Sequence, residues 1–143
     1  MASLAMLQRA LILLLLTVGL AKGAGAADRV IHKEKSLYSN ILVTQSRDRR
    51  CLAFSVRRKK PKQTCIDLDD PDKVVFDYVR MVFASLLINP EPKRLLMIGL
   101  GGGTISTVFG KVYPGLQQDL VEIDPAVVKI AADYFAFRPG ANT

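Results

Sequence analysis

The segment Gly99–Gly103, which reads Gly-Leu-Gly-Gly-Gly, constrains the fold of this chain more than any other feature. It follows the apolar run Leu95–Ile98 and precedes a stretch with helical spacing from about Thr104 to Val112. Glycines permit a tight turn and let a ligand approach the main chain closely. A helix that starts at such a turn directs free N–H groups and the positive end of its dipole at that ligand. The order strand, glycine turn and helix therefore predicts a ligand site.

A second apolar segment, Leu120–Asp124, ends in acids at the spacing expected of a ribose-binding strand. A carboxylate about 20 residues after the glycines can accept hydrogen bonds from ribose hydroxyls. We expect Glu122 to do so, because strand alternation places it on a different face from Ile123. For Asp124 the alternative is to cap the helix that Pro125 begins. The predicted site residues are Gly99, Gly101, Gly102, Gly103, Glu122 and Asp124.

The spacing of the glycines distinguishes two classes of ligand. The dinucleotide pattern G-x-G-x-x-G requires a glycine where this chain has Thr104. Gly99-x-Gly101-x-Gly103 is instead the form used by proteins that bind S-adenosylmethionine, which carries no pyrophosphate. A tight turn that binds no ligand is the structural alternative. The pattern favours an adenosyl ligand.

The expected order of elements places the chain in the α/β class. Residues 28–69 are β-like and predict a small antiparallel meander or hairpin pair, with β-prone stretches at Ser39–Gln45, Cys51–Val56 and Gln63–Leu68. A helix is expected from Asp70 and Pro71 to about Leu87. Residues 70–143 then read β-α-β-α from Leu95, the first half of a Rossmann-like parallel sheet whose strands are buried on both faces. Such sheets commonly have about five or more strands, so we expect part of the fold to lie outside this sequence.

Residues 1–27 have the pattern of an export signal. Arg9 precedes an apolar run from Ala10 to Ala21, and Ala24-Gly25-Ala26 fits a small-x-small cleavage site. The run is shorter than the ~20 residues that span a bilayer, which favours cleavage over an uncleaved membrane anchor. The expected location is periplasmic or secreted after cleavage, and membrane-associated through the N-terminus otherwise.

The basic residues and cysteines argue against two classes of site. The net charge of +7 comes largely from a cluster between Arg47 and Lys62. Because Phe54 alone supplies an aromatic ring there, a solvated hairpin tip is favoured over a nucleic-acid surface. The two cysteines and the single histidine have no metal-ligand spacing, so no metal site is expected.

Cys51 and Cys65 are expected to face each other if the strands that carry them form a hairpin with its turn near Arg58. Directly opposed strand positions can meet the geometry of a disulfide. Two small buried thiols are the alternative. The sequence leaves both states open.

At the glycine turn and the acid the chain resembles the spermidine synthase-like branch of the polyamine aminopropyltransferase family. The matching segments are Lys93–Ser106, Val121–Phe135, Glu34–Val43, Arg50–Phe54 and Gln63-Thr64. The resemblance implies an N-terminal β-domain, a Rossmann-like domain, decarboxylated S-adenosylmethionine as donor and a polyamine as acceptor. It also implies that Gln63 contacts the donor and that Tyr78 lies near the acceptor amine.

The chain departs from the family at several positions. Gly102 stands where the synthases usually have an acid, and Ser39 where they have a glutamine. After Tyr78, Val79 and Arg80 replace polar or acidic residues, and a cationic Arg80 would repel a polyamine. The family's catalytic aspartate follows the last expected helix, so we assign no catalytic residue and expect an incomplete transferase.

Three functions remain open on the sequence. The first is aminopropyl transfer. The second is methyl transfer from S-adenosylmethionine by a protein that keeps the donor site. The third is a non-catalytic exported module that binds a nucleoside or a partner. An open sheet edge would favour association, with a homodimer as one outcome.

Overall fold

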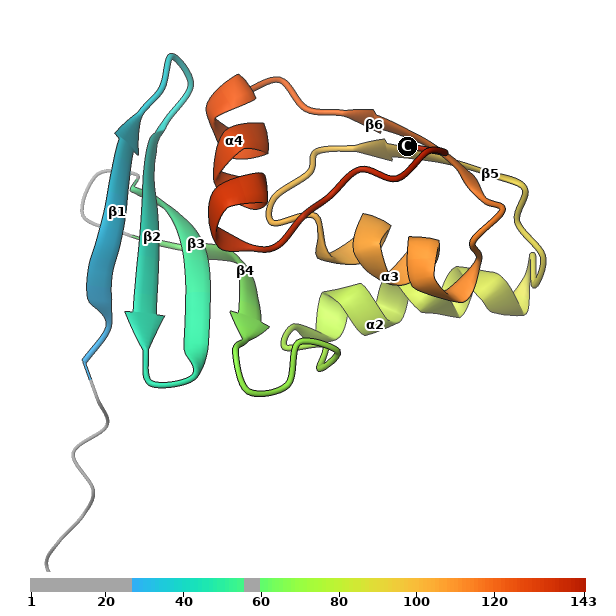
Figure 1. Ribbon diagram of the computed structural model, residues 1–143, viewed down its shortest axis with the longest axis horizontal. Coiled ribbons are helices and arrows are strands. Elements are labelled where there is room, and N and C mark those ends of the chain that lie inside the picture. Colours follow the sequence, from blue (N-terminus) through green and yellow to red (C-terminus); the bar gives the residue numbers. More distant parts are fainter. Residues whose placement is uncertain (1–26, 56–59) are drawn as a thin grey trace, which may run out of the picture.

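The computed structural model describes residues 27–55 and 60–143, and its first sheet is an antiparallel meander of order β1-β2-β3-β4 (Figure 1). Its strands are β1 (Arg29–Lys35), β2 (Asn40–Ser46), β3 (Arg49–Ser55) and β4 (Lys62–Asp67). The expected antiparallel region is confirmed, and β1 adds a strand that the sequence pattern did not single out. The predicted signal, but for residue 27, and the predicted turn near residue 58 lie outside the described residues.

The second part of the chain contains helices and a parallel pair of strands, β5 and β6. In chain order the elements are α2 (Asp77–Phe83), the 3-10 helix η1 (Ala84–Leu87), β5 (Arg94–Ile98), α3 (Thr104–Val112), β6 (Gln117–Val121) and α4 (Pro125–Tyr134). The β-α-β-α order predicted from Leu95 onward is confirmed. The α/β fold class is likewise confirmed.

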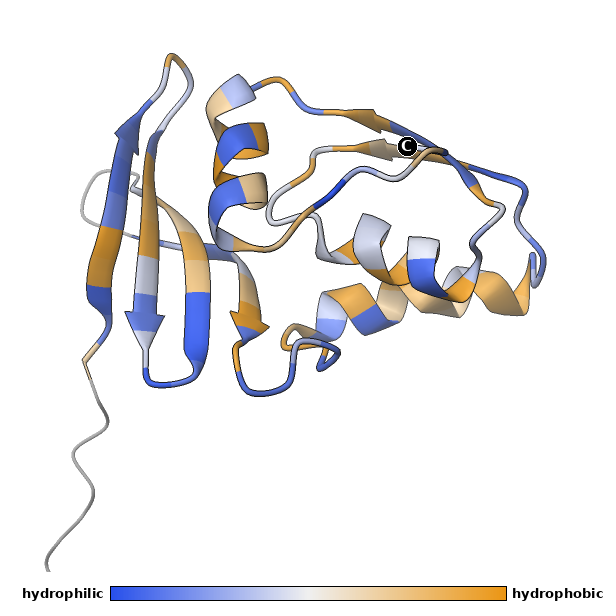
Figure 2. Cartoon of the chain, in the orientation of Figure 1, coloured by the Kyte–Doolittle hydropathy of each residue, from blue (hydrophilic) through white to orange (hydrophobic). Residues whose placement is uncertain are grey.

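Helix α4 lies between the two sheets and contributes to the core on both sides (Figure 1). Toward the antiparallel sheet, α4 and the residue after it pack on β2 and β3 in one buried cluster: Ile41, Val43, Leu52, Val127, Ile130 and Phe135. Toward the parallel pair, Ala131 packs with Leu100 and Phe137. Figure 2 shows hydrophobic residues on β2, on β3 and along α4. Each fully buried aliphatic side chain contributes about 1.5–3 kcal/mol, so α4 holds the two sheets together. The predicted division at residues 69 and 70 stays a prediction.

The start of the first helix differs from the prediction. The carboxylate of Asp67 accepts the backbone N–H groups of Asp69 and Asp70, both at 3.2 Å, and pairs with the Lys73 ammonium at 2.5 Å. These contacts fold the segment after β4 into turns, so the expected cap at Asp70 is wrong. The helix begins at Asp77, with Phe76 at its N-cap position.

The parallel strands are also less buried than expected. On one face, four apolar side chains of β5, β6 and the residues after them are 54–82% exposed: Leu96, Ile98, Val121 and Ile123. The other face packs partly buried Met97 and Leu120 against the cluster around Ala131. The prediction of burial on both faces is therefore wrong for the described part of the chain, where two strands alone form this sheet. None of the described helices is long and apolar enough to cross a membrane.

Candidate functional site

The glycine turn connects β5 to α3 with a backbone that favours glycine at three positions. Gly99, Gly101 and Gly103 have φ values of 88°, 59° and 78°, which side chains rarely tolerate. The N–H of Gly99 donates to the carbonyl of Val121 at 2.7 Å, and that of Gly103 to the carbonyl of Leu100 at 3.0 Å. The turn is therefore fixed to the end of β6.

The glycines of this turn have two different surroundings. A Cβ on Gly99 or Gly101 would meet nothing within 4 Å, so both positions border open space. A Cβ on Gly102 would lie 2.6 Å from Cγ2 of Thr64, and one on Gly103 would lie 2.4 Å from Cδ2 of Phe137. The first two positions leave room for a ligand, whereas the other two pack against the protein.

Glu122 follows β6 and bonds directly to the glycine turn. Its Oε2 accepts the N–H of Leu100 at 2.8 Å, and its Oε1 accepts the N–H of Asp124 at 3.0 Å. Asp124 is 4% exposed, and its carboxylate accepts the N–H of Ala126 at 3.0 Å. Asp124 thus caps α4, as the alternative interpretation of its position proposed.

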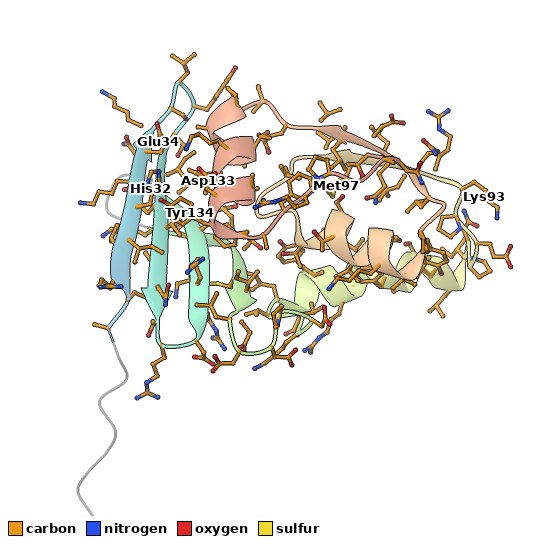
Figure 3. The ribbon with its side chains drawn as sticks, in the orientation of Figure 1. His32, Glu34, Lys93, Met97, Asp133 and Tyr134 are labelled. Atoms are coloured by element: carbon orange, nitrogen blue, oxygen red, sulfur yellow. A yellow bond between two sulfur atoms is a disulfide. The ribbon has the colours of Figure 1, made fainter. Side chains whose placement is uncertain are left out.

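These groups surround a cavity of about 610 Å³. Among its lining residues are six that the sequence or the resemblance singled out for the site: Gly99, Gly101, Glu122, Asp124, Gln63 and Tyr78. Gly102 and Gly103 do not line it. Apart from its two acids, the lining described for this cavity is neutral and largely apolar, and Met97 lies on its β5 side (Figure 3). The cavity therefore combines an open glycine turn with negative charge.

Three further lining residues come from the antiparallel sheet and its first loop: Tyr38, Ser39 and Phe54. The sequence pattern assigns Tyr38 and Phe54 no role in a site, although both fall in segments that carry the family resemblance. The cavity lies where these segments meet the glycine turn, and no local spacing rule brings them together.

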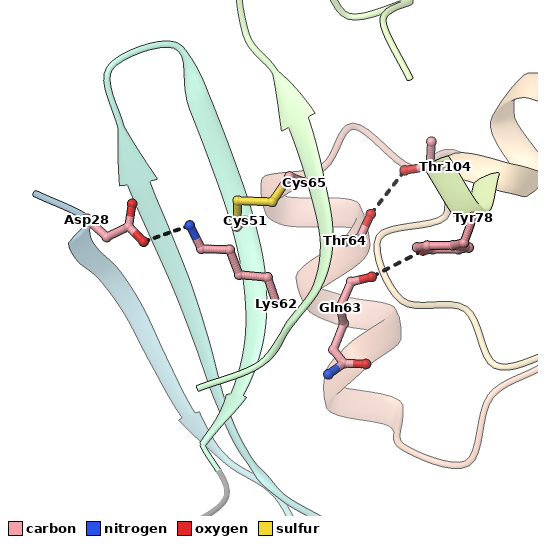
Figure 4. Close-up of a disulfide and its surroundings, with 8 residues drawn as sticks. All are labelled: Asp28, Cys51, Lys62, Gln63, Thr64, Cys65, Tyr78 and Thr104. Atoms are coloured by element: carbon pink, nitrogen blue, oxygen red, sulfur yellow. Dashed lines mark hydrogen bonds and ion pairs between the residues drawn. A yellow bond between two sulfur atoms is a disulfide. The ribbon is translucent and has the colours of Figure 1, made fainter. Parts of the chain in front are cut away.

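Strand β4 supplies one wall of the cavity and its links to α2 and α3. The hydroxyl of Tyr78 donates to the carbonyl of Gln63 at 3.1 Å, and the hydroxyls of Thr64 and Thr104 lie 3.2 Å apart (Figure 4). Burial raises the pKa of Tyr78 above its ordinary 10.0, against the opposing effect of a hydrogen bond with Thr64. The Tyr78 hydroxyl therefore stays protonated at neutral pH and donates its proton to the Gln63 carbonyl, and its oxygen can still accept a hydrogen bond.

Cys51 and Cys65 form a disulfide between β3 and β4 (Figure 4). The two residues are register partners, and both are almost fully buried. The predicted opposition of the two cysteines is confirmed, and of the two states left open the disulfide is the one present.

The remaining polar clusters lie outside this cavity. The His32 ring packs against that of Tyr134 in a tilted arrangement with centroids 5.0 Å apart, and its Nε2 lies 3.3 Å from Oε2 of Glu34 (Figure 3). From the basic cluster, Arg50 donates to the carbonyl of Tyr134, and Lys62 pairs with Asp28. Within the described ranges, no group of three or more His, Cys, Asp or Glu side chains is placed to hold a metal ion.

Comparison with known proteins agrees with this fold. No protein-family model matches the chain. A polyamine aminopropyltransferase of Vibrio vulnificus is 48% identical over 80% of this chain and 38% of its own length. An eEF1A lysine and N-terminal methyltransferase of Xenopus laevis is 32% identical over 56% of this chain and 14% of its own length. A probable spermidine synthase from Corynebacterium glutamicum shares the fold, with a TM-score of 0.63 and 21% identity over 80% of this chain and 42% of its own.

Fold and cavity together define a Rossmann-like α/β protein with an antiparallel sheet before its parallel strands. It is similar in sequence to a polyamine aminopropyltransferase and in fold to a probable spermidine synthase. The chain spans 38% of the length of the Vibrio relative.

Proposed function

We propose that this chain binds decarboxylated S-adenosylmethionine and forms the donor-binding part of a polyamine aminopropyltransferase. The observation that carries the proposal is the contact between Glu122 and the turn: one carboxylate bonds to the backbone at Leu100 and also lines the cavity beside Gly99 and Gly101. The name of the Vibrio relative supports the reaction class.

The carboxylate of Glu122 has capacity for a ribose. Each of its oxygens accepts one backbone N–H, whereas an ionised carboxylate offers about four acceptor sites. Two acceptor sites are therefore left for the 2′- and 3′-hydroxyls of an adenosyl group. The open faces of Gly99 and Gly101 let the rest of the ligand approach the main chain.

The charge of the cavity favours a sulfonium nucleoside over a dinucleotide. Glu122 and Asp124 lie in its wall, and no Lys, Arg or His is among the described residues that line it. A positive sulfonium and a cationic aminopropyl tail are attracted to such a wall, whereas a pyrophosphate is repelled. The S-adenosylmethionine type of ligand predicted from the glycine spacing therefore also fits the electrostatics.

In aminopropyl transfer, an uncharged acceptor amine attacks the aminopropyl carbon attached to sulfur. A C–N bond forms, the C–S bond breaks with its electron pair going to sulfur as a neutral thioether, and the new ammonium releases a proton. Tyr78 is placed to orient the amine because it borders the cavity and its hydroxyl oxygen can accept an N–H of the amine, which leaves the lone pair of the nitrogen free. Arg80 does not line the cavity, since its guanidinium donates to Asp77 and to the carbonyl of Val74. Its expected repulsion of a polyamine is thereby reduced.

Methyl transfer is the second candidate, favoured by the similarity to the Xenopus methyltransferase. Titration calorimetry with three ligands separates the candidates: decarboxylated S-adenosylmethionine, S-adenosylmethionine and methylthioadenosine. Tightest binding of the decarboxylated donor supports aminopropyl transfer, and preference for the complete amino-acid tail supports methyl transfer. If none of the three binds, the donor-site proposal is wrong and a non-catalytic module is favoured.

Export remains a proposal based on residues 1–27 alone. Mass spectrometry of the protein made in its own host tests it: a mature chain that starts near Ala27 supports cleavage. A chain that keeps the segment and sediments with membranes supports the anchor.

A further inference from the structure

Strand β4 connects the disulfide to the glycine turn through consecutive residues. Gln63 lines the cavity, Thr64 is 2% exposed and contacts the turn, and Cys65 bonds to β3 (Figure 4). The Thr64 hydroxyl lies 3.2 Å from that of Thr104, the first residue of α3.

The methyl group of Thr64 packs against the other side of the same turn. Its Cγ2 lies 2.6 Å from the place that a Cβ on Gly102 would occupy. Thr64 therefore touches the turn at Gly102 by packing and at Thr104 by a hydrogen bond. These two contacts lie on either side of Gly103 and limit its freedom to move.

Besides side-chain contacts such as the bond from Tyr78 to the carbonyl of Gln63, the strand that carries Thr64 is restrained by its ladder with β3. In the described sheet β4 is an edge strand that pairs with β3 alone. Their register runs from Arg49 opposite Asp67 to Leu52 opposite Thr64 and is interrupted beyond that pair. The disulfide is the covalent link in this short ladder, and it lies one residue from Thr64.

We propose that Thr64 is a positioning residue for the glycine turn and that the Cys51–Cys65 disulfide holds it there, so that reducing the disulfide loosens the turn. The consequence for donor affinity rests on the proposed function, whereas the consequence for the turn itself does not. A dithiol supplies the two electrons and two protons that convert the disulfide to two thiols, and becomes a cyclic disulfide itself.

Amide hydrogen exchange measured by mass spectrometry tests the proposal without any ligand. The protected amides of the turn are those of Gly99, Leu100 and Gly103, and the amide of Thr107 in α3 donates to the carbonyl of Gly103. Thr64→Val keeps the shape and removes the hydroxyl, and we expect these amides to exchange about fivefold faster, the effect of one net hydrogen bond. Thr64→Ser keeps the hydroxyl but lacks the methyl contact with Gly102, and it is expected to recover part of the protection.

Thr44→Val is the matched control, because Thr44 is a buried β2 residue opposite Cys51 in register. It is expected to leave exchange in the turn unchanged. Reduction with dithiothreitol is expected to accelerate exchange in the turn, with α4 as the internal reference. Unchanged exchange in Thr64→Val, or in the fully reduced protein, overturns the proposal. The proposal is also overturned if exchange in the turn is accelerated equally in Thr44→Val, or if exchange in α4 is accelerated as much as in the turn. Either result shows general destabilisation.

Calorimetry adds the functional consequence. If the oxidised wild-type protein binds decarboxylated S-adenosylmethionine, we expect about fivefold weaker binding by Thr64→Val and partial recovery in Thr64→Ser. Absence of binding by the oxidised wild type contradicts the proposed function, while the exchange data still decide the role of Thr64. Binding that is equal in wild type and Thr64→Val contradicts positioning of the donor site by Thr64.

Discussion

The carboxylate of Glu122 accepts the backbone N–H of Leu100 at 2.8 Å. This bond joins the residue after β6 to the turn after β5, across the carboxyl ends of two parallel strands. Ligands of open parallel sheets bind at this edge. The bond therefore places a ribose acceptor and an open glycine backbone at the border of one cavity.

Gly101→Ala tests whether the turn needs its unusual backbone. With φ at 59°, a side chain there costs about 1–2 kcal/mol. Gly115→Ala is the control, because that position also has no atom within 4 Å of a Cβ but has no positive φ. Urea unfolding should show the loss in the first variant and a change within about 0.5 kcal/mol in the second. Equal stabilities of the two variants would contradict the described turn.

Gly102→Ala should destabilise the protein for a different reason. The added Cβ would lie 2.6 Å from Cγ2 of Thr64, and overpacking of this kind costs about 1–3 kcal/mol. Combining it with Thr64→Ser removes that methyl group and should recover part of the loss. A double-mutant cycle measures this coupling, and strictly additive effects would show that the two positions are not in contact.

Removal of the disulfide should lower the free energy of unfolding. The bonded cysteines are 14 residues apart in sequence, and closing a loop of this size contributes about 3 kcal/mol. Urea unfolding of the oxidised and the reduced protein measures the difference. If both forms unfold at the same urea concentration, the bond does not stabilise this sheet.

Stability should depend on pH through Asp67 and Lys73. Their hydrogen bond lowers the pKa of Asp67 below 3.8 and raises the pKa of Lys73 above 10.5. The Asp67 contribution is therefore complete above pH 3.8 and is lost as pH falls through its folded-state pKa. The Lys73 contribution is complete below pH 10.5 and is lost as pH rises through its raised pKa.

The variant Asp67→Asn tests the loss of stability that is expected at low pH. It should be less stable than wild type at neutral pH, and the two should converge as the pH falls below 3.8. Asp77→Asn is the control, since its exposed pair with Arg80 contributes little. Thermal unfolding across this pH range gives both curves. A stability gap that persists at the lowest pH would contradict the assignment.

Local sequence patterns predicted the elements whose cause is local. The glycine turn and the cap at Asp124 follow from patterns within a few residues. The opposed cysteines follow from one hairpin, and the acid after β6 from one strand-helix-strand unit. The start of α2 could not be predicted in this way, because the Asp67 carboxylate binds the Lys73 ammonium and the backbone amides of Asp69 and Asp70. The pattern had placed the cap of the helix at Asp70.

The rest of the site depends on contacts between distant segments. Tyr38 and Phe54 reach the cavity because α4 packs against β2 and β3 through Val127 and Ile130. The difference between the open Gly101 and the packed Gly102 arises from Thr64, a residue of another sheet. Neither contact can be predicted from the spacing of residues along the chain.

Titration calorimetry of Glu122→Gln with decarboxylated S-adenosylmethionine tests the central claim most directly. The substitution keeps the shape of the side chain but replaces one carboxylate oxygen by an NH2 group, which removes the charge and leaves the N–H of Leu100 or of Asp124 without its acceptor. Binding should therefore weaken by about 10- to 150-fold. Asp119→Asn on β6, where the exposed pair with Arg94 lies outside the cavity, should bind like wild type. Equal affinities of wild type and Glu122→Gln would contradict the account.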